Sequence, residues 1–214
     1  LIYYPYKDHQ QMERAGMNEV LWEQACWLLL VFRCGLSMPI VNTIIAFWCI
    51  QKRRRLLDFF VASTQTWRVD CQLEEKVITK LEMVRGKQDE HNYPQSWPPL
   101  VEQVEIIKQL TDESIHLLTL LDETYPRHLK KAMNELYLPP IFFYTGDLHI
   151  LERTTIAIIG SRDASEASLA FTHEAARCLA EQNANVLSGY TRGVDRAIYD
   201  GATSTGGVTT VVLP

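Results

Sequence analysis

The chain has 214 residues, enough for one large domain or two small ones. Its residues are 47% hydrophobic and 22% charged, which is typical of globular proteins and excludes a largely disordered chain. The formal net charge of −5 provides no overall attraction to nucleic acid, so any DNA-binding site has to be local.

The cysteines predict reduced thiols in a cytoplasmic protein. They are odd in number, no two have C-x-x-C spacing, and no histidines cluster with them, so neither a disulfide framework nor a zinc site is expected. They are Cys26, Cys34, Cys49, Cys71 and Cys178.

Two apolar stretches, residues 26–32 and 40–50, are shorter than the roughly 20 residues that span a bilayer. We therefore expect buried helices and no membrane contact. The first residues contain no apolar signal-peptide core. Because the chain begins at Leu1 and stops directly after an expected strand, we expect it to be a piece of a longer protein.

Residues 1–85 are expected to form a small all-α domain. Asn18 is a suitable N-cap, and apolar residues then recur at helical spacing up to Leu30. Gly35, Ser37 and Pro39 indicate a break and a new helix start. Further helices are expected over 40–50, 55–62 and 73–84, with the tryptophans in the core: Trp22, Trp27, Trp48 and Trp67.

Residues 86–99 are polar and then proline-rich, which predicts a linker. The rest of the chain, 100–214, is expected to form an incomplete Rossmann-like domain. It begins with a helix over 100–110, an apolar strand within 114–120 and a proline-led strand within 138–144.

The last 60 residues alternate between strand and helix patterns. Strands are expected at 155–159, 185–189 and 209–213, with helices at 165–182 and 195–203 between them. This order predicts an α/β fold, a partial doubly wound parallel sheet with right-handed crossovers. The apolar first strand is expected to be buried on both faces. Asp163 and Glu166 have the spacing of a capping box.

Two loops follow the first and second of these strands. They are Gly160-Ser161-Arg162 and Ser188-Gly189-Tyr190-Thr191-Arg192-Gly193-Val194-Asp195. The carboxyl ends of neighbouring parallel strands meet at the edge where ligands bind in this architecture. Glycines, hydroxyls, helix N-termini and arginine guanidinium groups together suit phosphate oxygens. The loops therefore predict a phosphate-binding site.

An alternative interpretation is purely structural, because strand ends often need glycines and the arginines could pair with Asp163 and Asp195. Neither a Walker A loop nor a G-x-G-x-x-G fingerprint is present. Tyr190 could stack on a base or simply pack at the sheet edge. The basic run 52–55 is interpreted as a solvated helix end rather than a phosphate contact.

These motifs resemble those of the DNA-processing protein A (DprA/Smf) family. The similarity rests on residues 157–162, 188–195 and Gly201-Ala202, with upstream pieces at 117–126 and 138–148. It is good from about residue 105 onward. The helical N-terminal region resembles the sterile-alpha-motif-like domain that precedes the Rossmann-like core in many members.

The resemblance implies a cytoplasmic, non-enzymatic protein that binds single-stranded DNA, forms a homodimer and helps to load the RecA recombinase during natural transformation. It implies no cofactor. The expected DNA-binding residues are Gly160, Ser161, Arg162, Ser188, Gly189, Tyr190, Arg192, Gly193 and Asp195.

Two other function classes remain open from the sequence. One is a nucleotide-binding sensor or nucleotide-processing enzyme, because related Rossmann-like folds bind nucleoside phosphates at the same strand ends. The other is a piece that serves only in interactions.

Overall fold

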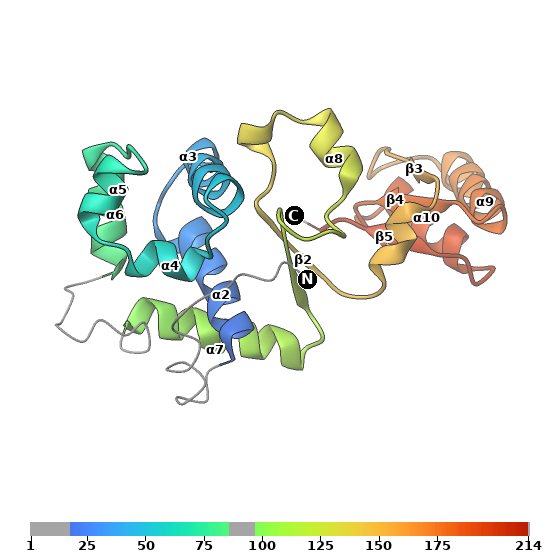
Figure 1. Ribbon diagram of the computed structural model, residues 1–214. Helices are drawn as coiled ribbons and strands as arrows, with labels where there is room; N and C mark the ends of the chain where they lie inside the picture. Colours follow the sequence, from blue (N-terminus) through green and yellow to red (C-terminus); the bar gives the residue numbers. More distant parts are fainter. Residues whose placement is uncertain (1–17, 86–96, 214) are drawn as a thin grey trace. The chain divides into compact units, whose positions relative to one another are not determined.

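The computed structural model describes residues 18–85 and 97–213, in two compact units. The N-terminal unit is Leu1–Thr145 and the C-terminal unit is Gly146–Pro214 (Figure 1). The expected linker lies mostly outside the described residues. The expected domains, 1–85 and 100–214, differ from these units because residues 100–145 contact the helices of the N-terminal unit. The domain boundaries remain a prediction.

The N-terminal unit is built mainly from helices, as the sequence predicts. Asn18 caps the first helix by accepting a hydrogen bond from the Leu21 N–H, and Ser37 precedes the next one, with Pro39 in its first turn. The helices are α2 (Glu19–Leu28), α3 (Met38–Ile44), α4 (Leu56–Val61), α5 (Thr64–Val69), α6 (Glu75–Arg85) and α7 (Pro98–Asp112), and π-helical turns η1 (Leu29–Arg33) and η2 (Ile45–Gln51) extend α2 and α3.

Aromatic side chains form the centre of the helical core. Phe59 stacks on Trp67 and meets Trp48 edge to face, with ring centroids 5.3 and 5.6 Å apart. Each indole N–H donates to a backbone carbonyl, Trp48 to Arg55 and Trp67 to Phe59. The expected core position is confirmed for three tryptophans, and Trp22 is partly buried against the same core.

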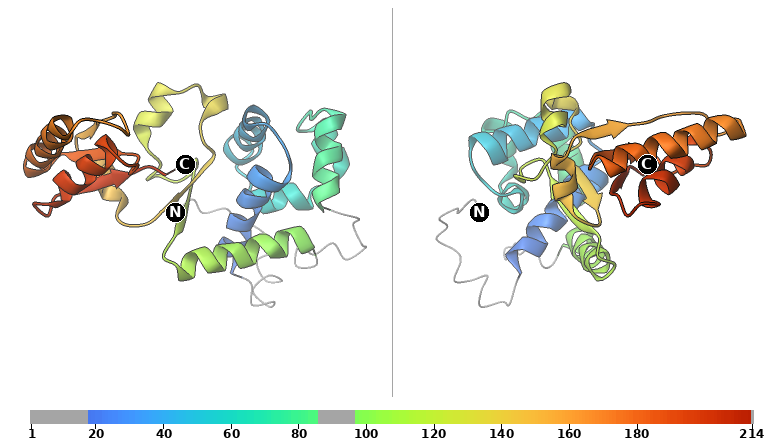
Figure 2. Two further views of the ribbon diagram at one scale, coloured as in Figure 1. Left: turned by 180° about the vertical axis from the view of Figure 1, so that it is seen from behind. Right: turned by 90° about the vertical axis from the view of Figure 1, so that its right-hand side faces the viewer.

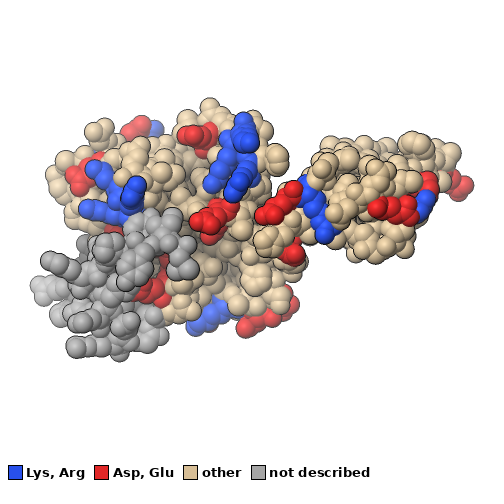
Figure 3. All heavy atoms as spheres, turned by 45° about the vertical axis from the view of Figure 1, so that its right-hand side comes forward, with Lys and Arg blue, Asp and Glu red and all other residues tan. Residues whose placement is uncertain are grey.

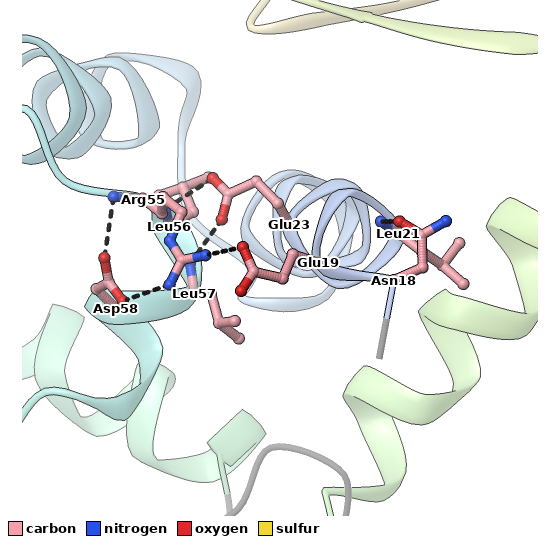
Figure 4. Close-up of polar contacts among 8 residues, drawn as sticks. All are labelled: Asn18, Glu19, Leu21, Glu23, Arg55, Leu56, Leu57 and Asp58. Carbon is pink, nitrogen blue, oxygen red and sulfur yellow. Dashed lines mark hydrogen bonds and ion pairs between the residues drawn. The ribbon is translucent and has the colours of Figure 1, made fainter. Parts of the chain in front are cut away.

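A carboxylate of α2, which is distant in the sequence, caps the first turn of α4 (Figure 4). Glu23 accepts hydrogen bonds from the Leu56 and Leu57 N–H groups at 2.8 and 3.0 Å. Beside it, Arg55 bridges Glu19 and Asp58. These contacts satisfy the first amides of α4, which has no capping hydroxyl of its own.

The N-terminal unit also contains a pair of antiparallel strands. These are β1 (His116–Thr119) and β2 (Ile141–Tyr144), and the segment that connects them contains α8 (Arg127–Ala132) and the short η4 (Glu135–Tyr137). The buried Asn42 of α3 donates to the carbonyls of Glu135 and Leu138 at 3.0 and 2.8 Å. Since α7 also packs against α2, the segment from α7 to β2 belongs with the helices.

The C-terminal unit alternates strand and helix as the sequence predicts. After the short η5 (Leu148–Glu152), β3 (Thr155–Ala157), α9 (Glu166–Glu181), β4 (Asn185–Ser188), α10 (Val194–Thr203) and β5 (Thr209–Val211) follow in order. The three strands are parallel and adjacent in the order β3-β4-β5. Helices α9 and α10 lie side by side (Figures 1 and 2) and share a small core with β4.

Two sequence predictions for this unit are wrong. Strand β3 is not buried on both faces, because Thr155 and Ala157 are exposed and Ile156 is only partly buried. Ile159, just beyond the strand, is 89% exposed. The N-cap of α9 is Ser165, whose hydroxyl accepts the Ser168 N–H, rather than Asp163. The serine starts the helix two residues later than the expected capping box.

The cysteines are free thiols. Cys26, Cys34 and Cys49 are buried, and burial raises the pKa of Cys34 to about 12. Within residues 18–85 and 97–213, no helix has the length and apolar character needed to cross a membrane.

Candidate functional site at the ends of two parallel strands

The two loops expected to bind phosphate lie directly against each other. The first loop, residues 160–165, follows β3, and the second loop, residues 189–193, follows β4. The Val194 N–H, at the start of α10, donates to the Ser161 carbonyl at 3.1 Å. Because β3 and β4 are adjacent and parallel, both loops belong to one carboxyl edge of the sheet.

Glycines make this close approach possible. Gly193 has φ +84°, and a Cβ there would lie 2.4 Å from the Ser161 carbonyl oxygen and 2.6 Å from that of Arg162. A Cβ on Gly160 would lie 2.5 Å from a methyl of Val194. The two loops therefore fit together only without these side chains.

The second loop is held from within by Asp195. Its carboxylate accepts a hydrogen bond from the Thr191 hydroxyl at 2.8 Å and a longer one from the Thr191 N–H at 3.4 Å. A Cβ on Gly189 would come within 2.9 Å of the same carboxylate. Ser188 is buried, and its hydroxyl points to the Asp195 carbonyl at 3.5 Å. Asp195 and Ser188 thus shape the loop.

One ion pair joins the two loops across the edge. Arg192 of the second loop contacts Asp163 of the first at 2.6 Å, and the two side chains are 73% and 78% exposed. Arg162 is also exposed and has no ion-pair partner among the residues that the structure describes. In the first loop, the Ser161 hydroxyl accepts the Asp163 N–H at 3.1 Å.

The structure adds two residues that the sequence did not indicate. The Arg196 guanidinium lies 4.9 Å from the ring centre of Tyr190 and 5.6 Å from that of Tyr199. It also donates to the Tyr190 hydroxyl at 2.6 Å and pairs with Asp200. No motif marks these positions, although the spacing of 196, 199 and 200 on α10 places them within one helical turn.

All nine residues expected from the sequence lie in or beside these two loops, but their exposure differs. Gly160, Ser161, Arg162, Tyr190 and Arg192 are exposed, Gly189, Gly193 and Asp195 are half-buried, and Ser188 is buried. The exposed members are therefore the ones available to a ligand.

Charges are mixed on the face drawn in Figure 3. Figure 3 shows Lys and Arg side chains interspersed with Asp and Glu on the face in view, rather than one continuous basic surface. The hydrogen bond and charge of Asp200 raise the pKa of Arg196, so this guanidinium stays protonated. In the described part of the chain, no group of His, Cys, Asp and Glu side chains is arranged to hold a metal ion.

The chain has a helical unit followed by a parallel α/β unit, and the candidate site lies at the carboxyl ends of β3 and β4. Residues 116–214 match the family described as DNA recombination-mediator protein A. The matched range contains both loops and every strand of the parallel sheet.

A sequence match and a structure match are both to DNA processing protein A (DprA) of Streptococcus pneumoniae. The chain is 31% identical to DNA processing protein DprA over 96 residues, which are 44% of this chain and 32% of that protein. It also resembles the X-ray structure of DNA processing protein A with a TM-score of 0.50 and 20% identity, over 88% of this chain and 57% of the other. The structural likeness supports the fold, and the two matches cover about one third and just over half of the matched chains.

Proposed function

We propose that this chain acts in DNA processing and recombination by binding single-stranded DNA through its phosphates at the two strand-end loops. Arg162 and Arg192 contact phosphate oxygens, and the backbone N–H groups of the first loop add neutral donors. Such a grip holds the DNA backbone and has no preference for a particular base sequence.

The ion pair between Arg192 and Asp163 carries this proposal. The Arg192 guanidinium contacts Asp163, the residue directly after Arg162. Two exposed arginines therefore lie at the same edge of the sheet. An exposed ion pair contributes only about 0–1 kcal/mol, so a phosphate replaces the Asp163 carboxylate at little cost. The glycines keep the two loops close enough for both arginines to act together.

The remaining expected residues support the site indirectly. Gly160, Gly189 and Gly193 permit the close packing, while Ser188 and Asp195 hold the second loop in place. Ser161 turns the first loop by accepting the Asp163 N–H. We propose a binding role without a catalytic step, with a RecA-type recombinase and a second copy of the chain as partners in the cytoplasm.

The test compares binding of fluorescent oligothymidylate by the full chain and by the double variant Arg162→Ala, Arg192→Ala, using fluorescence anisotropy at low salt. The double variant should lose at least about tenfold in affinity, since hydrogen bonds to charged groups contribute about 1.5–3 kcal/mol each.

The matched control is Arg153→Ala, which removes one arginine from the same unit. Arg153 lies two residues before β3, and its guanidinium donates a hydrogen bond to Asn183, two residues before β4. It therefore lies at the amino ends of the strands, away from the two loops. This variant should bind like the parent chain. Equal affinity of the parent chain and the folded double variant would refute the proposal, and binding of free nucleotides but not of oligothymidylate would favour a nucleotide sensor.

A further inference from the structure

We propose that Tyr190 is a preformed stacking surface for an unpaired nucleobase and that Arg196 and Tyr199 hold its ring in position. This inference rests on the proposed function, because the phosphates bound by the neighbouring arginines bring the bases to the second loop. It assigns to the site a preference for single strands, whose bases are free to stack.

The backbone at Tyr190 is the first observation. Tyr190 has φ +57°, a conformation that a bulky side chain rarely adopts and that costs about 1–2 kcal/mol. Glycine would avoid this cost at a loop position. Strained residues persist where the surrounding structure fixes them, and they cluster at functional sites.

The contacts around the ring are the second observation. The Arg196 guanidinium lies over the Tyr190 ring and donates to its hydroxyl, while Tyr199 meets the ring edge to face at a centroid distance of 4.7 Å. Asp200 anchors Arg196 from the next turn of α10. The ring is therefore fixed from two neighbouring positions of one helix before any ligand arrives.

Exposure is the third observation. Although it has these partners, Tyr190 remains 39% exposed, on the same loop as Arg192. A fixed aromatic ring beside a phosphate-binding arginine is the combination that single-strand-binding proteins use, because every base has a face that can stack. Little conformational entropy is lost on binding, since the ring is already ordered.

The experiment compares two oligonucleotides with the same backbone, oligothymidylate and an abasic oligomer of equal length, by anisotropy with the full chain. The parent chain should bind oligothymidylate about 5- to 150-fold more tightly than the abasic oligomer, the range expected for stacking of one base. Tyr190→Leu should reduce this ratio toward one and leave the abasic affinity unchanged.

Two further variants separate stacking from loop structure. Arg196→Gln should reduce the ratio in part, because the ring loses the contact that orients it, and Tyr137→Leu, which removes an exposed tyrosine of the N-terminal unit, should leave it unchanged. An unchanged ratio in a folded Tyr190→Leu chain would refute the stacking role while leaving the phosphate site intact. If neither oligomer binds the parent chain, the proposed function itself fails.

Discussion

At the scale of single residues, the candidate site depends on which side chains are absent as much as on those present. Gly193 and Gly160 allow two loops to touch, and this contact gives Arg162 and Arg192 a common edge. Asp163 neutralises Arg192 when no ligand is bound.

Removing the negative charge of Asp163, the partner of Arg192, is expected to increase the affinity for single-stranded DNA. Asp163→Asn should raise the affinity for oligothymidylate about two- to fivefold, because it removes a negative charge from the site and frees Arg192. Anisotropy at low salt measures the effect. Glu181→Gln, which removes another exposed acid paired with an arginine, here Arg177 on α9, is the control and should have no effect. Weaker binding by Asp163→Asn would show that Asp163 itself supports the ligand.

Gly193 yields a prediction about stability. Gly193→Ala should lower the free energy of unfolding by at least about 1–3 kcal/mol, because the new Cβ meets two carbonyl oxygens in a backbone region suited to glycine. Urea unfolding measures the loss. Gly206→Ala also has positive φ but open space around the Cβ, so it should cost less. Equal costs would mean that the contact between the loops is not tight.

At the scale of helices and strands, one helix of the helical unit is capped by a side chain from another helix that is distant in the sequence. Glu23 lies on α2 but satisfies the first amides of α4, and Arg55 joins Glu19 to Asp58 beside it (Figure 4). Local sequence patterns cannot reveal such a cap, since the two helices meet only in the folded chain.

The Glu23 carboxyl leads to a prediction about pH. Burial raises its pKa above the ordinary value of 4.5, although the hydrogen bonds from Leu57 and Leu56 oppose the shift. The folded state then binds this proton more tightly than the unfolded state. Its contribution to the free energy of unfolding is therefore largest below pH 4.5 and declines as the pH rises through the raised pKa.

Urea unfolding of the parent chain and of Glu23→Gln between pH 4 and 8 tests this dependence. Glu23→Gln should also cost about 0.5–2 kcal/mol, because the amide can no longer accept both N–H bonds of α4. The difference between the two chains should shrink as the pH rises. A difference that grows with pH would contradict the raised pKa.

The sequence predicts most helices and strands, but it does not predict features that depend on tertiary contacts. Strong periodicity and caps locate α2, α9 and the three parallel strands to within a few residues. The short α8 and the π-helical turns carry no such signal, and α5 has a capping serine, Ser63, but is too short to show a periodic pattern. An apolar run suggested a fully buried β3, but burial depends on what packs against the sheet. The loops of the candidate site were found because their glycines and arginines are contiguous, whereas Arg196 and Tyr199 join the site only through the helix geometry.

At the scale of the whole molecule, the expected domain boundaries and the compact units make different predictions. We propose domains 1–85 and 100–214 joined by residues 86–99, whereas contacts separate the units between Thr145 and Gly146. Limited proteolysis followed by mass spectrometry should locate the first cut within 86–99. The cleaved parts should remain associated during size exclusion, because α7 packs against α2. A first cut near residue 145 would contradict these boundaries.

If Arg162 and Arg192 hold the DNA through its phosphates, binding depends on salt concentration, and this dependence is the most direct test. The logarithm of the oligothymidylate binding constant should fall linearly with the logarithm of salt concentration, by about 0.7 per phosphate contact on a single strand. The double variant Arg162→Ala, Arg192→Ala should reduce the magnitude of this slope by about 1.4, while Arg153→Ala should leave it unchanged. A slope that is the same in the parent chain and the folded double variant would contradict a phosphate grip by these two arginines.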